Sequence, residues 1–162
     1  MTIKDARSHR RRSALTDFIT AARAYIRRIA GLGDGAELDV RELHALLGDL
    51  QAGAARLRRR AGRNEAVRPT GAAIEKLSYE ELRARLRHLP IDSYSVVFDA
   101  LDPDAAAMQH LVVDDLADIY SDLVDGFEKL RTDGTAAAIA TWRSLYYFHW
   151  GRHAVHAQTA LW

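Results

Sequence analysis

Apolar side chains recur at helical spacing in five stretches of this 162-residue chain, and this periodicity constrains its fold more than any other feature. A repeat of three or four residues places apolar side chains on one face of an α-helix, whereas a half-buried strand needs alternation. The five stretches are residues 15–29, 40–57, 78–89, a long segment that follows Pro103 and ends near Leu130, and residues 136–162. The sequence therefore predicts an all-α domain built as a mainly antiparallel bundle of five helices.

Residues at the ends of these stretches agree with helix boundaries. Ser78 and Glu81 have the spacing of a capping box, in which each side chain satisfies a backbone N–H at the start of a helix. Glycines at positions 31, 33 and 35 follow the first helical stretch. A phosphate-binding loop would need a strand before the glycines and a helix after them, so we interpret this run as a helix end.

One short segment has strand-like composition. Residues 94–98, Tyr-Ser-Val-Val-Phe, are rich in β-branched and aromatic side chains, but no second segment offers an obvious partner strand. We therefore expect no sheet, and we expect an extended apolar segment over about residues 91–103 that packs across the bundle. Residues 1–162 form a single domain in this interpretation, with residues 1–12 as a basic and flexible N-terminal arm.

Charge is unevenly distributed between the two halves of the chain. Residues 1–90 hold 19 Lys and Arg against 11 Asp and Glu, a net charge of +8, whereas residues 91–162 hold 4 against 11, a net charge of −7. Two halves of opposite sign either neutralise each other on folding, which we favour, or present a basic face to an anionic partner.

No cysteine is present, which excludes disulfides and thiolate metal sites. No apolar run approaches the roughly 18 residues of a membrane span, and we expect a cytoplasmic protein.

Aspartate and histidine side chains gather on the last two predicted helices. Asp115, Asp118 and Asp122 share one edge of the fourth helix, and His149 and His153 lie four residues apart on the fifth. Facing carboxylates and imidazoles are how helical bundles build metal sites. The sequence therefore allows a metal site formed by Asp118, Asp122, His149 and His153.

The same residues also fit a core without a metal ion. On a helical wheel His153 falls inside an aromatic stripe, where a neutral imidazole needs only one or two hydrogen bonds. In this interpretation, which we favour, Asp118 or Asp122 accepts one of them and His153 is a packing residue. Asp115 and Asp122 then pair with arginines.

Other charged residues are candidates for binding a partner. Arginines that could contact phosphates cluster near the end of the second helix, but no helix-turn-helix, RNA-binding signature or aromatic platform accompanies them, so nucleic acid is not favoured. We expect the charged residues in contact with a partner to be Arg56, Arg58, Arg59, Arg60, Asp114 and Asp125.

Part of the chain resembles a bacterial family of unassigned activity. The segments that carry the resemblance are His110-Leu-Val-Val-Asp-Asp-Leu-Ala-Asp-Ile-Tyr-Ser-Asp-Leu123, the segment from His149 to Leu161, and Tyr94-Ser-Val-Val-Phe-Asp99. They are similar to domain of unknown function family 5063 over roughly residues 78–162. The resemblance implies a small, mostly helical bacterial domain and supplies no catalytic residue.

These observations favour binding over catalysis. Ser121 and Ser144 lie within helices, without the strand-turn-helix elbow that exposes a nucleophilic serine. We therefore expect a protein that is not an enzyme, has no cofactor, and binds another protein or itself through a helix face. Metal binding through the Asp and His residues is the alternative function, and nucleic-acid binding is the third.

Overall fold

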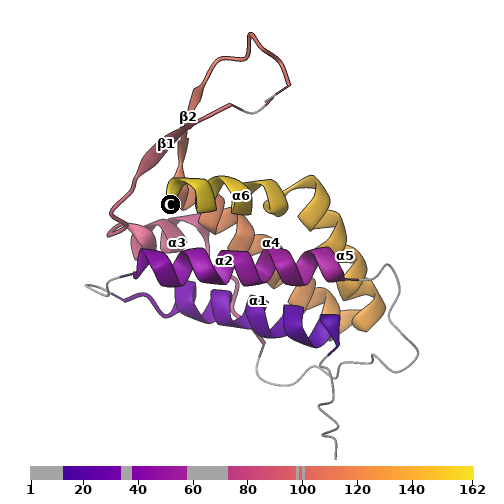
Figure 1. The fold of residues 1–162 in the computed structure, drawn as a ribbon. Helices are drawn as coiled ribbons and strands as arrows, with labels where there is room; N and C mark the ends of the chain where they lie inside the picture. Colours follow the sequence, from indigo (N-terminus) through magenta and orange to yellow (C-terminus); the bar gives the residue numbers. More distant parts are fainter. Residues whose placement is uncertain (1–12, 34–37, 58–72, 98, 100) are drawn as a thin grey trace, which may run out of the picture.

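Six helices and one two-stranded sheet make up the described part of the chain (Figure 1). The computed structural model describes residues 13–33, 38–57, 73–97, 99 and 101–162, so the predicted N-terminal arm lies outside the described residues. The elements are α1 (Ala14–Ala30), α2 (Val40–Arg56), α3 (Tyr79–Leu86), β1 (Ser93–Val96), β2 (Met108–Leu111), α4 (Val112–Thr132), α5 (Thr135–Phe148) and α6 (Trp150–Ala160). The predicted mainly helical class is confirmed. Among these described helices, none has the length and apolar character needed to cross a membrane.

Each of the first three helices begins just after a residue whose side chain caps its first turn, and at α2 the Asp39 carboxylate accepts a hydrogen bond from the Arg41 N–H. The Ser13 hydroxyl accepts a hydrogen bond from the Thr16 N–H at the start of α1. At the start of α3, the Ser78 hydroxyl accepts from the Glu81 N–H and the Ser78 N–H donates to the Glu81 carboxylate. The predicted capping box is therefore present, and it satisfies backbone donors that the first turn of α3 would otherwise leave without partners.

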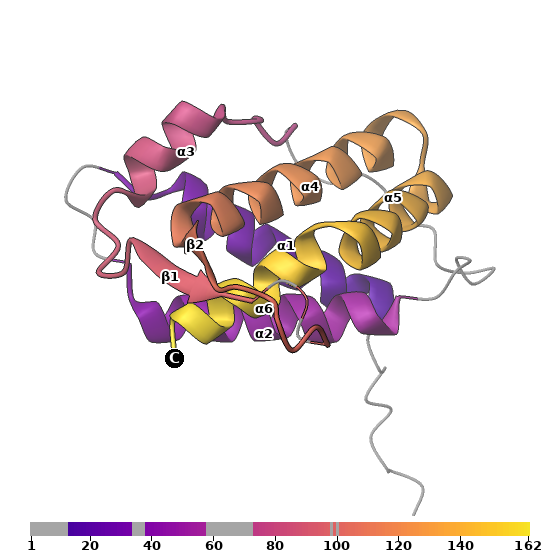
Figure 2. The ribbon, with the colours of Figure 1, turned by 90° about the horizontal axis from the view of Figure 1, so that it is seen from above.

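Large aromatic side chains join the helices into one core. Figure 2 shows α4 between α3 on one side and α6 on the other. Trp142 of α5 and Trp150 of α6 are fully buried, and Phe18 of α1 contacts both rings, with centroids 5.1 and 6.5 Å away. The buried Tyr25 hydroxyl donates to the Leu116 carbonyl of α4, 2.8 Å away. These contacts tie α1, α4, α5 and α6 together, so α4 is fixed on several sides.

The predicted fifth helix is two helices, and the count of five is therefore wrong. Helix α5 ends at Phe148, and α6 begins at Trp150 after His149, whose φ of −142° and ψ of −91° are not helical. The apolar periodicity continues through this break, which is why the sequence concealed it. The break brings the chain very close to itself, because a Cβ at Gly151 would lie 2.2 Å from the Tyr146 carbonyl oxygen. Glycine at position 151 permits this approach.

The expectation of no sheet is also wrong, because β1 and β2 form an antiparallel hairpin. The register pairs Tyr94 with His110 and Val96 with Met108. Helix α4 starts at Val112, directly after β2, and not soon after Pro103 as predicted. The hairpin projects from the bundle (Figure 1), and Leu101 is 94% exposed. Residues 91–103 therefore do not pack across the bundle as a whole, although Ile91 and Tyr94 at the base of the hairpin contact the core.

Candidate metal centre

The base of the hairpin, one edge of α4 and the start of α6 bring ionisable side chains together at one place. Helix α4 contributes three aspartates, the α5–α6 break contributes His149, α6 contributes His153, and the hairpin contributes one residue from each strand. We call this group the Asp/His cluster, and its members are Tyr94, His110, Asp115, Asp118, Asp122, His149 and His153.

Asp115 lies at the centre of the cluster and is completely buried. Its Oδ1 atom lies 2.7 Å from His153 Nδ1 and 2.9 Å from His110 Nε2, and its Oδ2 atom accepts a hydrogen bond from the Tyr94 hydroxyl at 2.5 Å. Because a carboxylate only accepts hydrogen bonds, the two imidazole nitrogens carry the hydrogens. Three donors thus compensate the cost of burying this carboxylate.

Asp122 orients His149 in the same way. Its Oδ2 atom lies 2.7 Å from His149 Nδ1, so His149 also donates from Nδ1 to an aspartate of α4. Burial raises the pKa of Asp122, and the hydrogen bond from His149 opposes that rise. The side chain of His149 is 43% exposed, so this histidine lies partly open to solvent.

His153 faces two aspartates with its two ring nitrogens. Nδ1 donates to Asp115, and Nε2 lies 3.5 Å from Asp118 Oδ2, longer than a hydrogen bond. The hydrogen bond to Asp115 raises the pKa of His153, and the charge of Asp118 adds to this rise against the effect of burial. The side chain of Asp118 is 44% exposed. The buried side of the cluster therefore lies at Asp115, and its open side at Asp118.

Within the described part of the chain, two sets of three residues have ligand atoms close enough to hold one metal ion. In the set Asp118, His149 and His153, the ligand atoms lie within 4.8 Å of one another. The other set, His110, Asp115 and His153, meets the same distance condition but is joined by hydrogen bonds of 2.9 and 2.7 Å. Nitrogen and oxygen atoms bound to one tetrahedral ion lie about 3.3 Å apart, so the spacing in this second set is that of hydrogen bonds.

The structure brings together all four residues that the sequence grouped as a metal site. His153 is buried as predicted, but its hydrogen bond goes to Asp115, and Asp118 and Asp122 do not supply it. Within the described residues, the partners found for Asp115 and Asp122 are histidines and a tyrosine and not the predicted arginines. The Arg143 side chain instead donates to the Leu57 carbonyl.

Sequence reasoning missed Tyr94 and His110 as members of the cluster. Tyr94 lies in the segment predicted to be extended and His110 in the predicted fourth helix, whereas the structure puts both on strands whose register places them side by side. The sequence offered one signal for both, because Tyr94 and His110 begin two of the segments that resemble the family.

Three of the candidate interaction residues, Arg56, Asp114 and Asp125, lie within the described part of the chain. The Tyr79 hydroxyl donates to Asp114, and Asp125 pairs with Lys76, with 2.5 Å between Nζ and Oδ1. Arg56 is exposed at the end of α2, and Arg58, Arg59 and Arg60 lie outside the described residues. Nucleic-acid binding through these arginines stays the third and disfavoured alternative.

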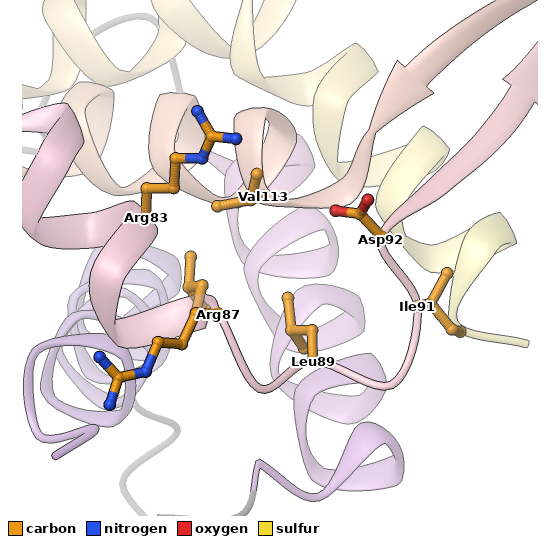
Figure 3. A pocket seen from close by; sticks show the side chains of 7 residues that line it. Arg83, Arg87, Leu89, Ile91, Asp92 and Val113 are labelled. Atoms are coloured by element: carbon orange, nitrogen blue, oxygen red, sulfur yellow. The ribbon is translucent and has the colours of Figure 1, made fainter. Parts of the chain in front are cut away.

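A separate pocket of about 220 Å³ lies between α3, the chain that leads into β1, and the start of α4 (Figure 3). Figure 3 shows the Arg83 guanidinium and the Asp92 carboxylate on different sides of the pocket, with aliphatic side chains between them. The residues that line this pocket are Arg83, Leu86, Arg87, Leu89, Ile91, Asp92 and Val113. No member of the Asp/His cluster lines it, so the two features are distinct.

Comparisons with known proteins agree with this fold. No curated protein matches the chain. The crystal structure of protein BF1032 from Bacteroides fragilis is similar, with a TM-score of 0.63 and 20% sequence identity, and the match covers 91% of this chain and 89% of that one. At this identity the similarity concerns the fold alone. The family described as domain of unknown function DUF5063 matches residues 10–162, well beyond the segment from residue 78 on which the sequence resemblance rested. The chain therefore belongs to the DUF5063 family.

Proposed function

We propose that this protein binds a divalent transition-metal ion through Asp118, His149 and His153. The observation that carries the proposal is that both histidines donate from Nδ1 to a buried aspartate of α4. Each histidine therefore keeps Nε2 as the nitrogen for a ligand. Histidines that bind metals almost always donate their other N–H to a carboxylate or carbonyl, which fixes the tautomer and orients the ring.

The spacing of the ligand atoms supports the same proposal. His153 Nε2 and Asp118 Oδ2 lie 3.5 Å apart, too far for a good hydrogen bond and close to the separation of about 3.3 Å across a tetrahedral ion. Although His153 is buried, its Nε2 points to the half-exposed Asp118, so an ion held there need not enter the aromatic core. Burial of the ring thus argues less strongly against a ligand role than the helical wheel suggested.

The donor set indicates the class of metal. Two imidazoles and one carboxylate suit zinc or iron(II), whereas magnesium and calcium prefer oxygen ligands alone. Three protein ligands leave at least one coordination position for water or a small molecule, as in catalytic zinc sites and in iron(II) sites with two histidines and one carboxylate. At low pH protons compete with the metal for His153, whose pKa is raised.

We expect the purified wild-type protein, freed of metal with a chelator, to bind one equivalent of Zn²⁺ in a calorimetric titration at pH 7.5. The variants His149→Gln and Asp118→Asn each lose a ligand, so we expect their affinity to fall at least about 100-fold. His88→Gln and Asp125→Asn change the same residue types outside the cluster and should bind as the wild type does. A wild type without a stoichiometric site, or ligand variants that match it, would contradict the proposal.

Binding of a protein partner is a second candidate function, and the projecting hairpin supports it. Large apolar side chains are exposed on this arm, namely Val97, Leu101 and Met108. Apolar groups exposed together often mark contact surfaces. Carboxylates accompany them at Asp99, Asp102 and Asp104, so the chemistry fits a partner with a basic and apolar surface.

The partner proposal predicts that cross-linking in the native host captures a protein at the hairpin. We expect Leu101→Asp to reduce this capture, because it places a charge where an apolar contact is proposed. Phe148→Asp is the matched control, since Phe148 is 85% exposed but lies at the α5–α6 break. Equal capture by the wild type and both variants, measured by mass spectrometry, would rule out the hairpin as the contact.

A further inference from the structure

The hairpin delivers both of its cluster residues to the same carboxylate. The strand register sets Tyr94 opposite His110, and both side chains reach Asp115. Figure 2 shows the base of the hairpin beside the start of α4 and over α6. The His110 ring also stacks beside the His153 ring, with centroids 6.0 Å apart and planes inclined by 26°. The hairpin base therefore contacts both Asp115 and the histidine that Asp115 orients.

We infer that Tyr94 and His110 are positioning residues of the metal site, which act on the ion through Asp115 and His153. This inference rests on the proposed metal-binding function. Tyr94 fixes one oxygen of Asp115, and His110 shares the other oxygen with His153. Both contacts fix the orientation of the Asp115 carboxylate, and the carboxylate in turn orients the His153 ring through the Nδ1–H hydrogen bond. Because the ring is rigid, its orientation also fixes the position of Nε2.

Neither hairpin residue takes part in the proposed set of ligands. The Tyr94 hydroxyl lies on Oδ2 of Asp115, and His110 Nε2 is used by its hydrogen bond to Oδ1 of the same carboxylate. The ligand atoms of the set belong to Asp118, His149 and His153, which come from α4, the α5–α6 break and α6. An effect of Tyr94 on metal affinity must therefore pass through Asp115, and an effect of His110 through Asp115 or through its stacking on the His153 ring.

The same contacts make the effect reciprocal. If docking of the hairpin raises the affinity for the ion, then binding of the ion stabilises the docked hairpin by the same factor. The hairpin, which is two short strands projecting from the bundle, depends on its base for support. Amide protons of β1 and β2 should consequently exchange more slowly when the ion is bound.

Tyr94→Phe tests the inference, because it removes one hydroxyl and keeps the ring. We expect its affinity for Zn²⁺, measured by competition with a chromophoric chelator, to fall about 10-fold, and that of His110→Gln to fall about 10- to 100-fold. The visible spectrum of the Co²⁺-substituted protein should change in both variants, because the ligand geometry changes. A merely structural role would lower the unfolding temperature and leave that spectrum unaltered.

Tyr79→Phe is the matched control, since the Tyr79 hydroxyl donates to Asp114 of α4 outside the cluster. It should keep the affinity and the Co²⁺ spectrum of the wild type. If the wild type binds Zn²⁺ and both hairpin variants match it in affinity and spectrum, the positioning role is wrong and the metal site stands. If the wild type binds no ion, the proposed function fails, and this inference fails with it. Should Tyr94→Phe not fold, His110→Gln decides between these outcomes.

Discussion

Replacing Asp115 with alanine is expected to destabilise the protein by about 3 to 5 kcal/mol, the range found when one partner of a buried ionic pair is removed. Asp115 is completely buried and accepts hydrogen bonds from three side chains. Without the Asp115 carboxylate, three side-chain donors lose their acceptor, namely those of Tyr94, His110 and His153. The base of the hairpin also loses the hydrogen bonds that attach it to α4. Urea denaturation followed by far-ultraviolet circular dichroism measures the change in unfolding free energy.

Asp125→Ala is the control for this substitution. It removes a carboxylate from the same helix, but Asp125 pairs with Lys76 at the surface, and both side chains are about half exposed. Surface ion pairs contribute about 0 to 1 kcal/mol, so the control should stay near the stability of the wild type. A similar loss of unfolding free energy in the two variants would contradict the prediction that burial and three hydrogen bonds give Asp115 its large contribution to stability.

Gly126→Ala should also destabilise the protein strongly, by about 3 kcal/mol, at the upper end of what overpacking usually costs. A Cβ atom at Gly126 would lie 1.9 Å from Trp142 Nε1, and that indole is fully buried and donates to the Leu123 carbonyl. Helices α4 and α5 must therefore separate, or the indole must leave its place and its hydrogen bond. Thermal unfolding monitored by tryptophan fluorescence reports both the stability and the surroundings of Trp142.

Gly48→Ala is a matched substitution within another helix. A Cβ there would lie 3.3 Å from Nε2 of Gln158, whose amide hydrogen bonds with Gln51 and the His44 carbonyl and must shift by only a few tenths of an ångström. Alanine favours a helix interior by up to about 1 kcal/mol over glycine, which offsets the cost of that shift, so this variant should stay within about 1 kcal/mol of the wild type in stability. If Gly126→Ala behaved like Gly48→Ala, the close packing of α4 against α5 would not limit the choice of residue at position 126.

The helices could be predicted because their signals are local. The stretch 15–29 lies within α1 at Ala14–Ala30, and the capping box at Ser78 starts α3. Periodicity and caps depend on residues a few positions apart, which one sequence displays directly.

The hairpin and the α5–α6 break could not be predicted in this way. Strand β2, Met-Gln-His-Leu, has no β-branched residue, and it becomes a strand through its pairing with β1. The break at His149 interrupts neither the apolar pattern nor the aromatic stripe. In retrospect Gly151 was the signal, but a single glycine in a helical pattern is compatible with an unbroken helix.

The residues of the candidate site also differ in whether the sequence alone predicts their position. The shared edge of the three aspartates of α4 follows from helical geometry. His149 and His153 do meet these aspartates, although the predicted single helix that carries them breaks at His149. Which nitrogen faces which carboxylate depends on the rotation of α6 against α4, and this rotation is a property of the packed core. The contributions of Tyr94 and His110 depend in addition on strand register, which a two-stranded hairpin reveals only once both strands are known.

The pairing of Val96 with Met108 separates the cluster from the tip of the hairpin. Since Tyr94 and His110 lie on the bundle side of that pair, the distance between them is set by the strands and not by the length of the loop. Insertions in exposed loop tips are usually tolerated. The loop can therefore be lengthened or shortened by design without moving the cluster, and a fluorescent reporter inserted there would sense the hairpin without replacing any residue of the cluster.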